Sequence, residues 1–229
     1  INTDNARELF PDYNASPESR RKFSAAVHEP SSTIANAVYD TMLAEPVPEG
    51  KAPVVLFTAG GAGAGKTYSL EAVGKMKQIK EDSNIVLDSN LSSAVSAIQK
   101  IEKAKAAGRD VAVILIVRDP LQALVNGALK RAMNPKDGRI VRLSTFLKNT
   151  EGSLETFKKL IDRYENDNSV SLLALENGAG LTKELSLDDV VKLHYNVRLG
   201  DLKNALDQEL KAGRISQAVY DATLGETGG

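Results

Sequence analysis

The sequence contains no cysteine, and this absence excludes several classes of protein. Without thiols the chain can have no disulfide scaffold, no thiolate nucleophile and no zinc site built on cysteine. Histidine is scarce as well, since only His28 and His194 are present, so a histidine-rich metal site is not expected. The lack of cysteine fits a reducing compartment, and we expect the protein in the cytoplasm.

Long hydrophobic runs and a strong excess of one charge are also missing. The longest apolar run, Val111–Val117, is too short to span a bilayer, and no signal-type segment opens the sequence, so no membrane partner is expected. The formal net charge is −1, which provides no field for attracting nucleic acid. The remaining composition, with 42% apolar and 26% charged residues, is that of a globular domain.

Apolar runs alternate with amphipathic segments through the middle of the chain. Strands are predicted at 54–59, 84–88, 111–117 and 169–175, and helices at 67–78, 91–108 (with Gly108 as its C-cap), 120–133 and 152–166. Strands that are apolar throughout are typical of parallel sheets with helices on both faces. The alternation therefore predicts an α/β fold with a doubly wound parallel sheet.

Helical extensions are predicted on both sides of this core. Residues 1–50 contain one helix that should stop at Pro30 and a second whose packed face should carry Ile34, Val38 and Met42. Residues 181–229 are predicted to form a helical tail. The core, 51–180, includes a basic, lid-like segment at about 130–150.

A glycine-rich stretch joins the first predicted strand to the first core helix. It fits G-x-x-x-x-G-K-[ST] through Gly60, Gly61, Ala62, Gly63, Ala64, Gly65, Lys66 and Thr67. Glycines let the backbone close around phosphates, and the amide groups at the helix start form an anion nest. We expect Lys66 to neutralise phosphate and the Thr67 hydroxyl to bind Mg²⁺, so ATP and Mg²⁺ are the predicted cofactors.

Two aspartates end predicted strands. Asp88 could accept a hydroxyl proton, bind substrate or hold Mg²⁺ through water, because strand ends converge on the ligand crevice; the alternative is that it caps the next helix. Asp119 resembles a Walker B acid, but Pro120 follows it, which favours a helix cap.

Arginines are found at the end of the predicted helix 120–133 and in the segment that follows it. Arg131, Arg139 and Arg142 could clamp phosphoryl oxygens from a lid that closes over ATP, or they could form a solvated basic face. Both histidines are interpreted as structural. The stretch 174–180 ("ALENGAG") is predicted to be a turn that borders the adenine.

Together these stretches resemble the zeta toxin family of P-loop kinases, over roughly residues 54–180. The family phosphorylates the sugar of a UDP-activated amino sugar and often pairs with an antitoxin, so the resemblance implies a kinase and a possible antitoxin partner. It gives Lys66 and Thr67 the phosphate and Mg²⁺ roles, and gives Arg131 with one or both of Arg139 and Arg142 the clamping role. Family members usually have two strand-end acids, a general base and a substrate ligand. Here there is room for one, Asp88, which must serve both roles or leave one to another group.

Three functions are compatible with these features. The first is transfer of the ATP γ-phosphate to a hydroxyl of a small molecule such as a nucleotide sugar. The alternatives are a nucleotide switch without transfer, and a toxin-like interaction module.

Overall fold

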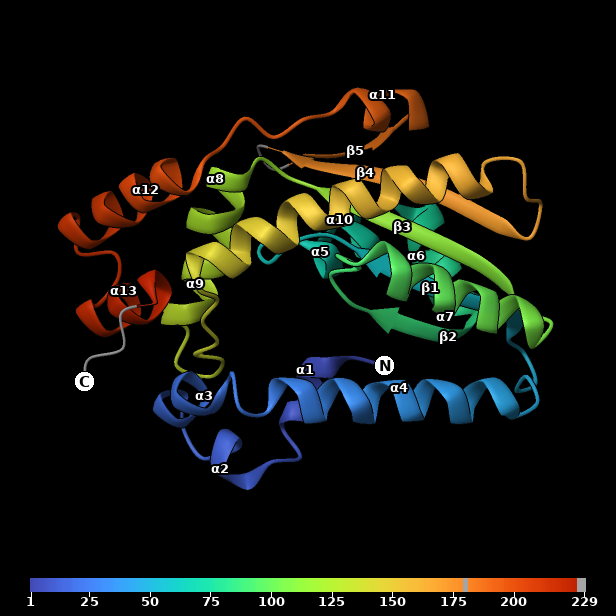
Figure 1. Cartoon of the computed structure of the whole chain (residues 1–229), viewed down its shortest axis with the longest axis horizontal. Coiled ribbons are helices and arrows are strands. Elements are labelled where there is room, and N and C mark those ends of the chain that lie inside the picture. Colours follow the sequence, from blue (N-terminus) through green and yellow to red (C-terminus); the bar gives the residue numbers. More distant parts are fainter. Residues whose placement is uncertain (179–180, 226–229) are drawn as a thin grey trace.

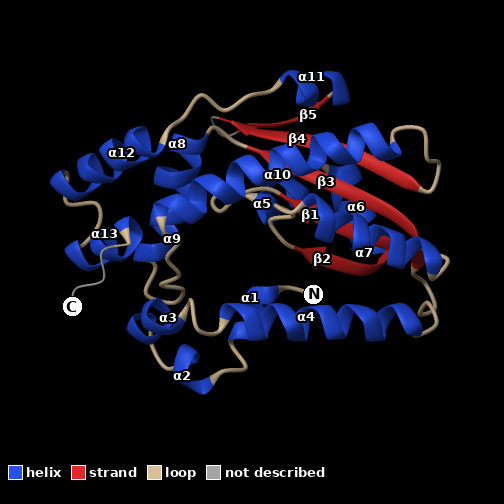
Figure 2. Cartoon of the chain, viewed as in Figure 1, coloured by secondary structure: helices blue, strands red, loops and turns tan. Residues whose placement is uncertain are grey.

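The computed structural model describes residues 1–178 and 181–225, and its centre is a five-stranded sheet between two layers of helices (Figures 1 and 2). The strand order is β2-β1-β3-β4-β5, and β1 to β4 pair in parallel while β5 runs antiparallel to β4. The strands are β1 (Ala52–Ala59), β2 (Ser83–Asp88), β3 (Asp110–Val117), β4 (Val170–Gly178) and β5 (Leu181–Leu185). The chain leaves β1 between β2 and β3, where open α/β sheets form their ligand crevice.

Helices cover both faces of this sheet, as the apolar strands predict. On one face Leu56, Ile114 and Ile116 pack against α5 (Lys66–Ala72) and α6 (Gly74–Asp82). On the other face the alternate strand residues pack against α4 (His28–Ala44), α7 (Ala94–Ala106) and α10 (Leu143–Tyr164). The doubly wound α/β architecture is therefore confirmed.

Two core helices differ from their predicted extents. The helix predicted at 67–78 is broken at Val73, whose backbone is extended (φ −109°, ψ 108°), so that α5 and α6 are separate helices. The helix predicted to begin at 152 begins instead at Leu143, and Gly152 lies inside it. A methyl group on Gly152 would lie 2.9 Å from the Ser92 carbonyl oxygen. That glycine therefore serves a close helix–loop contact and does not mark a helix start.

The helices before the sheet also correct two expectations. They are α1 (Thr3–Arg7), α2 (Pro11–Asn14), α3 (Pro17–Phe23) and α4. Pro30 does not stop a helix but lies in the first turn of α4, where a proline loses no hydrogen bond. The fully buried face of α4 carries Ser31, Ala35 and Tyr39. Of the predicted residues, Met42 is partly buried and packs against the core, whereas Val38 is 42% exposed. The spacing of four was right, but the fully buried stripe lies one position further along.

The segment between β3 and α10 is helical up to residue 133. It comprises α8 (Pro120–Ala123), the π-helical turn η1 (Leu124–Ala128) and α9 (Leu129–Met133), followed by a loop over 134–142. Three helices follow the sheet, namely α11 (Leu187–Lys192), α12 (Leu199–Lys211) and α13 (Gln217–Leu224). A second apolar cluster joins α12 and α13 to α9 and α10, around Phe146, Leu202 and Leu206 (Figure 1).

The predicted turn at 174–180 is wrong for the part that the structure describes. Residues 174–178 complete β4 and pair with β5, while residues 179–180 lie outside the described residues. β5 had no strong sequence signal, because its five residues are all exposed or half-buried and carry no apolar alternation.

Candidate phosphate and acceptor site

The loop over 60–67 forms a cradle whose backbone favours glycine at three of its positions. Gly60, Gly63 and Gly65 have φ of 141°, 75° and 85°, which L side chains rarely adopt. A methyl group on Gly63 would lie 2.1 Å from the Ala123 carbonyl oxygen, and one on Gly65 would lie 2.2 Å from the Asn177 amide nitrogen. The loop leads directly into α5, which begins at Lys66, and Thr67 in its first turn is exposed. These residues fit a bound polyphosphate.

Lys66 extends back across the cradle toward the end of β2. Its Nζ donates to the Gly60 carbonyl oxygen at 3.2 Å and lies 3.9 Å from Oδ1 of Asp88. The side chain is only 16% exposed. Burial lowers the pKa of the Lys66 ammonium, and Asp88 partly opposes this shift while Arg131 adds to it. The site therefore holds a cation whose own hydration is largely removed, which favours an incoming anion.

Asp88 ends β2 directly beside Thr58 of β1, because the two residues are partners in the parallel register. The Thr58 hydroxyl donates to Asp88 Oδ1 at 2.7 Å, and the Asn2 amide donates to Oδ2 at 3.2 Å. The helix that follows is capped by Ser93 rather than by Asp88. The carboxylate thus faces Lys66 at the carboxyl end of the sheet.

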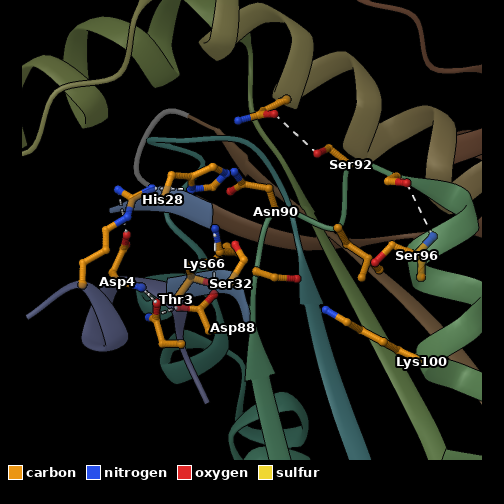
Figure 3. A pocket seen from close by; sticks show the side chains of 17 residues that line it. Thr3, Asp4, His28, Ser32, Lys66, Asp88, Asn90, Ser92, Ser96 and Lys100 are labelled. Carbon is orange, nitrogen blue, oxygen red and sulfur yellow. Dashed lines mark hydrogen bonds and ion pairs between the residues drawn. The ribbon is translucent and has the colours of Figure 1, made fainter. Parts of the chain in front are cut away.

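A polar cavity of about 410 Å³ opens beside Lys66 and Asp88 (Figure 3). One wall is the loop from Asp88 to Ser96, and the other comes from α1 and the start of α4. Lys100 also lines it. A pocket so rich in hydroxyl, amide and cationic groups suits a polar, hydroxylated small molecule.

His28, which the sequence suggested to be structural, also lines this cavity (Figure 3). Arg7 lies with Nη2 2.7 Å from His28 Nδ1. Because arginine can only donate, Nδ1 accepts and the proton of the neutral ring is on Nε2. Burial and the Arg7 charge lower the pKa of His28, which keeps the ring neutral. Nothing in "VHEP" indicated this, since the contact spans 21 positions.

Two of the three predicted arginines lie close to the cradle. Arg131 lies four residues after Gly127, which packs directly on Gly63. A methyl group added to Gly127 would lie 2.5 Å from Gly63 Cα. The charges of Arg131 and Arg139 both act on the pKa of Lys66. Arg142 extends elsewhere, with its Cδ 3.5 Å from a methyl built on Gly225. Arg131 and Arg139 thus lie within electrostatic range of Lys66, whereas Arg142 lies beside the end of α13.

Arg139 is held by two carboxylates. Its Nε and Nη2 donate to Asp137 at 2.5 and 2.9 Å, and its Nη1 pairs with Asp4 from α1. These contacts raise the pKa of Arg139, with the Asp137 hydrogen bond as the largest cause. Asp4 also lines the cavity, so α1 contacts the loop over 134–142, hereafter the arginine loop, at the site itself.

Three residues near the ends of β3 and β4 have roles that the structure makes clear. Asp119 accepts a hydrogen bond from Gln122 N at 2.9 Å, so its interpretation as the cap of α8 is confirmed. Arg118 and Asn177, which the sequence analysis missed as contributors to the site, contact the cradle from β3 and β4. Only their positions at strand ends could have indicated this.

Within residues 1–178 and 181–225, no group of three or more His, Asp or Glu is placed to hold a metal. The Thr67 hydroxyl, exposed in the first turn of α5, could ligate a bound Mg²⁺ together with phosphate oxygens and water, which is usual for Mg²⁺. In the same part of the chain no helix has the length and apolar character needed to cross a membrane.

Comparisons with known proteins agree with this geometry. Residues 76–177 match the profile of the zeta toxin family. The crystal structure of the AvrRxo1-ORF1:-ORF2 complex with ATP aligns with a TM-score of 0.54 and 16% identity, covering 95% of this chain and 89% of that chain. The native complex and the complex with sulphate ions align with TM-scores of 0.52 at 17% identity, covering 82% and 94% of this chain and 78% and 88% of theirs. No curated protein matches the sequence. The P-loop kinase-like fold predicted from the sequence is thereby confirmed.

Proposed function

We propose that the chain is an ATP-dependent kinase that phosphorylates a hydroxyl of a small molecule, such as a nucleotide sugar. The match of residues 76–177 to the zeta toxin family supports this proposal. The observation that carries this proposal is the pairing of Lys66 with Asp88. The side chains of Lys66 at the start of α5 and Asp88 at the carboxyl end of β2 lie 3.9 Å apart, and one polar cavity opens on both. A phosphate cradle and an acceptor pocket thus meet at one point.

On the phosphate side, the residues of 60–67 would hold ATP, and the exposed Thr67 hydroxyl would ligate Mg²⁺. When bound, ATP supplies the phosphoryl group and Mg²⁺ offsets its charge. Lys66 places a positive charge beside the cradle, and Arg131 and Arg139 add two more in range of it. The ATP in the similarly folded complex supports nucleotide binding here.

On the acceptor side, Asp88 is the group that can take a hydroxyl proton. Thr58 fixes its Oδ1, so an incoming hydroxyl would approach Oδ2, where the Asn2 amide now donates. Because β2 pairs directly with β1, no further strand lies between the cradle and Asp88. We therefore assign both acceptor orientation and proton acceptance to this one carboxylate. Phosphoryl transfer needs mainly positioning and charge stabilisation, which these residues provide.

Labelled ATP tests the proposal directly. The protein is incubated with Mg·ATP and a panel of nucleotide sugars, nucleosides and dinucleotides, and label in an acceptor is measured. We expect one acceptor class to gain phosphate and Lys66→Ala to abolish the transfer. Lys75→Ala, which removes a lysine of α6 outside the cavity, is the matched control and should transfer at the wild-type rate. Equal transfer by Lys66→Ala would refute the kinase assignment.

A specific observation favours a second candidate, a toxin-like protein that binds ATP without transfer. The Asn2 amide donates a hydrogen bond to Asp88, and Asp4 forms an ion pair with Arg139. The N-terminal segment therefore contacts both groups that transfer would need. In this candidate the chain would act as a nucleotide switch or interaction module, with an antitoxin as a possible partner in the cytoplasm. The two-chain complexes found among similar folds support a protein partner. Mg-dependent ATP binding without any labelled acceptor would select this candidate.

A further inference from the structure

We propose that Arg118 and Asn177 are positioning residues that hold the loop over 60–67 in its phosphate-binding shape from outside. The inference rests on the proposed function in one respect, namely that this loop binds the phosphates of ATP. It adds two residues that contact the loop backbone and that lie outside the P-loop sequence pattern. Both are donors that face carbonyl groups of the loop.

An anion cradle has to turn its amide groups inward, which turns its carbonyl groups outward. Those carbonyls then need donors of their own, because an unpaired buried carbonyl is costly. Two consecutive ones are satisfied by side chains. Arg118 Nη1 donates to the Gly63 oxygen at 3.2 Å, and Asn177 Nδ2 donates to the Ala64 oxygen at 2.8 Å.

The Asn177 contact controls the direction of a phosphate-facing amide. In a trans peptide the carbonyl and the N–H point in opposite directions. The Ala64 carbonyl and the Gly65 N–H belong to the same peptide unit, so fixing the oxygen on Asn177 directs that N–H to the other side. Asn177 is 6% exposed and lies where a methyl on Gly65 would meet it at 2.2 Å. The amide is therefore packed against the loop as well as bonded to it.

Arg118 acts on the preceding peptide unit. The Gly63 carbonyl shares its unit with the Ala64 N–H, which donates to the Gly61 oxygen at 3.2 Å inside the loop. Holding Gly63 from outside therefore stabilises this internal turn. Arg118 follows the end of β3 and Asn177 lies near the end of β4, which are adjacent parallel strands. The sheet itself thus carries both supports at the correct spacing.

The first test measures how strongly the amides of the loop are protected from hydrogen exchange in the absence of nucleotide. Amide hydrogen exchange of residues 60–67 is compared in wild type, Asn177→Leu and a control, Asn84→Leu. The control changes the same residue type near the start of β2, at the edge of the sheet opposite to the loop. We expect faster exchange of the loop in Asn177→Leu alone, since leucine keeps the branched shape of the side chain and removes the donor. Unchanged exchange in a folded Asn177→Leu would overturn the inference.

The second test measures binding of Mg·ATP by calorimetry. We expect Asn177→Leu to weaken binding about tenfold or more, equivalent to about 1.4 kcal/mol, while Asn84→Leu stays within about twofold. Arg118→Met should also lose about tenfold and Arg118→Lys, which keeps a donor, should recover most of it. The comparison of Arg118→Met with Arg118→Lys tests the inference if Asn177→Leu does not fold. Wild-type affinity in Asn177→Leu and Arg118→Met would overturn the inference. Failure of the wild type to bind Mg·ATP would instead refute the proposed function, and the exchange experiment would still test the positioning role.

Discussion

At the residue scale, burial of the Lys66 charge lowers the stability of the nucleotide-free fold and favours the binding of an anion. The ammonium is mostly buried, and its pKa is lowered chiefly because burial removes its hydration. The folded chain therefore holds this proton less tightly than the unfolded chain does, so the charged lysine destabilises the nucleotide-free fold at neutral pH. That penalty is full below the lowered pKa and disappears as the pH rises toward the ordinary lysine value. Sites that bind anions often carry such a cost.

Lys66→Met should therefore stabilise the nucleotide-free protein. We expect a melting temperature higher by about 2–4 °C for each kcal/mol of relieved penalty, and a gap to wild type that narrows as the pH is raised toward the ordinary lysine pKa of about 10.4. Thermal unfolding between neutral and alkaline pH measures both effects. Added Mg·ATP should raise the melting temperature of the wild type only. A lower melting temperature for Lys66→Met at neutral pH would contradict the assigned cost.

Gly63 and Gly74 predict opposite outcomes for the same substitution. Alanine at Gly63 would meet the Ala123 carbonyl oxygen at 2.1 Å in a left-handed conformation, so Gly63→Ala should cost about 2–4 kcal/mol and abolish ATP binding. Gly74 begins α6 and has open space around it, so Gly74→Ala should stabilise by about 0.4–1 kcal/mol. Urea unfolding of both variants checks the contrast. Equal changes in the free energy of unfolding for the two variants would show that Gly63 is not closely packed on α8 and η1.

The arginine loop is the informative feature at the scale of elements, because it is tied to the N-terminal helices. Arg20 of α3 donates to the carbonyl oxygens of Lys136 and Asp137, at 3.3 and 3.1 Å. Gly138 packs on Pro17, and Arg139 pairs with Asp4. The loop therefore moves only if these contacts to α1 and α3 rearrange.

Removing the Asp4 charge should release Arg139 toward phosphate. In Asp4→Asn, Asp137 still holds the guanidinium while Nη1 becomes available, so we expect Mg·ATP to bind about threefold to tenfold more tightly. The fold should lose less than about 1 kcal/mol, because the pair is partly exposed. Asp12→Asn, which changes the same charge on exposed α2, is the control. Calorimetry that finds weaker binding in Asp4→Asn would mean that Asp4 orients Arg139 for binding.

The C-terminal helices are part of one packed molecule rather than a detachable tail. Leu202 and Leu206 of α12 are fully buried with Phe146 of α10 in the second apolar cluster. This cluster also includes Leu129 of α9, two residues before Arg131. Packing at this end of the molecule therefore supports α9, the helix that carries Arg131. The division of the chain near residues 50 and 180 stays a prediction.

Leu206→Ala should destabilise the whole protein by about 2–5 kcal/mol, the usual cost of a cavity in a packed core. Leu199→Ala, on the same helix but 46% exposed, should change stability by less than about 0.5 kcal/mol. Denaturant unfolding followed by circular dichroism provides both values. A transition in two steps for Leu206→Ala would mean that α12 and α13 unfold independently of the sheet.

The sequence predicted the parts of the molecule that depend on local patterns. Four buried strands, the glycine cradle and the cap at Asp119 follow from apolar runs, spacing and turn chemistry. The start of α10 was missed because Gly152 suggests a boundary, whereas its role is contact with Ser92. The places of His28 and Asn177 depend on contacts 21 and 113 positions apart, which no local pattern encodes. The family resemblance rested on the cradle together with the order of the strands, helices and arginine-bearing segment that follow it up to residue 180.

The central claim is that Asp88 completes a kinase site around the cradle, and one paired measurement on Asp88→Asn tests it. Mg·ATP affinity is measured by calorimetry, and label transfer is measured with a mixture of nucleotide sugars, nucleosides and dinucleotides. We predict ATP affinity within about threefold of wild type and transfer reduced at least about 100-fold, since asparagine keeps the shape but cannot accept the proton. Transfer by Asp88→Asn at the wild-type rate would contradict the account.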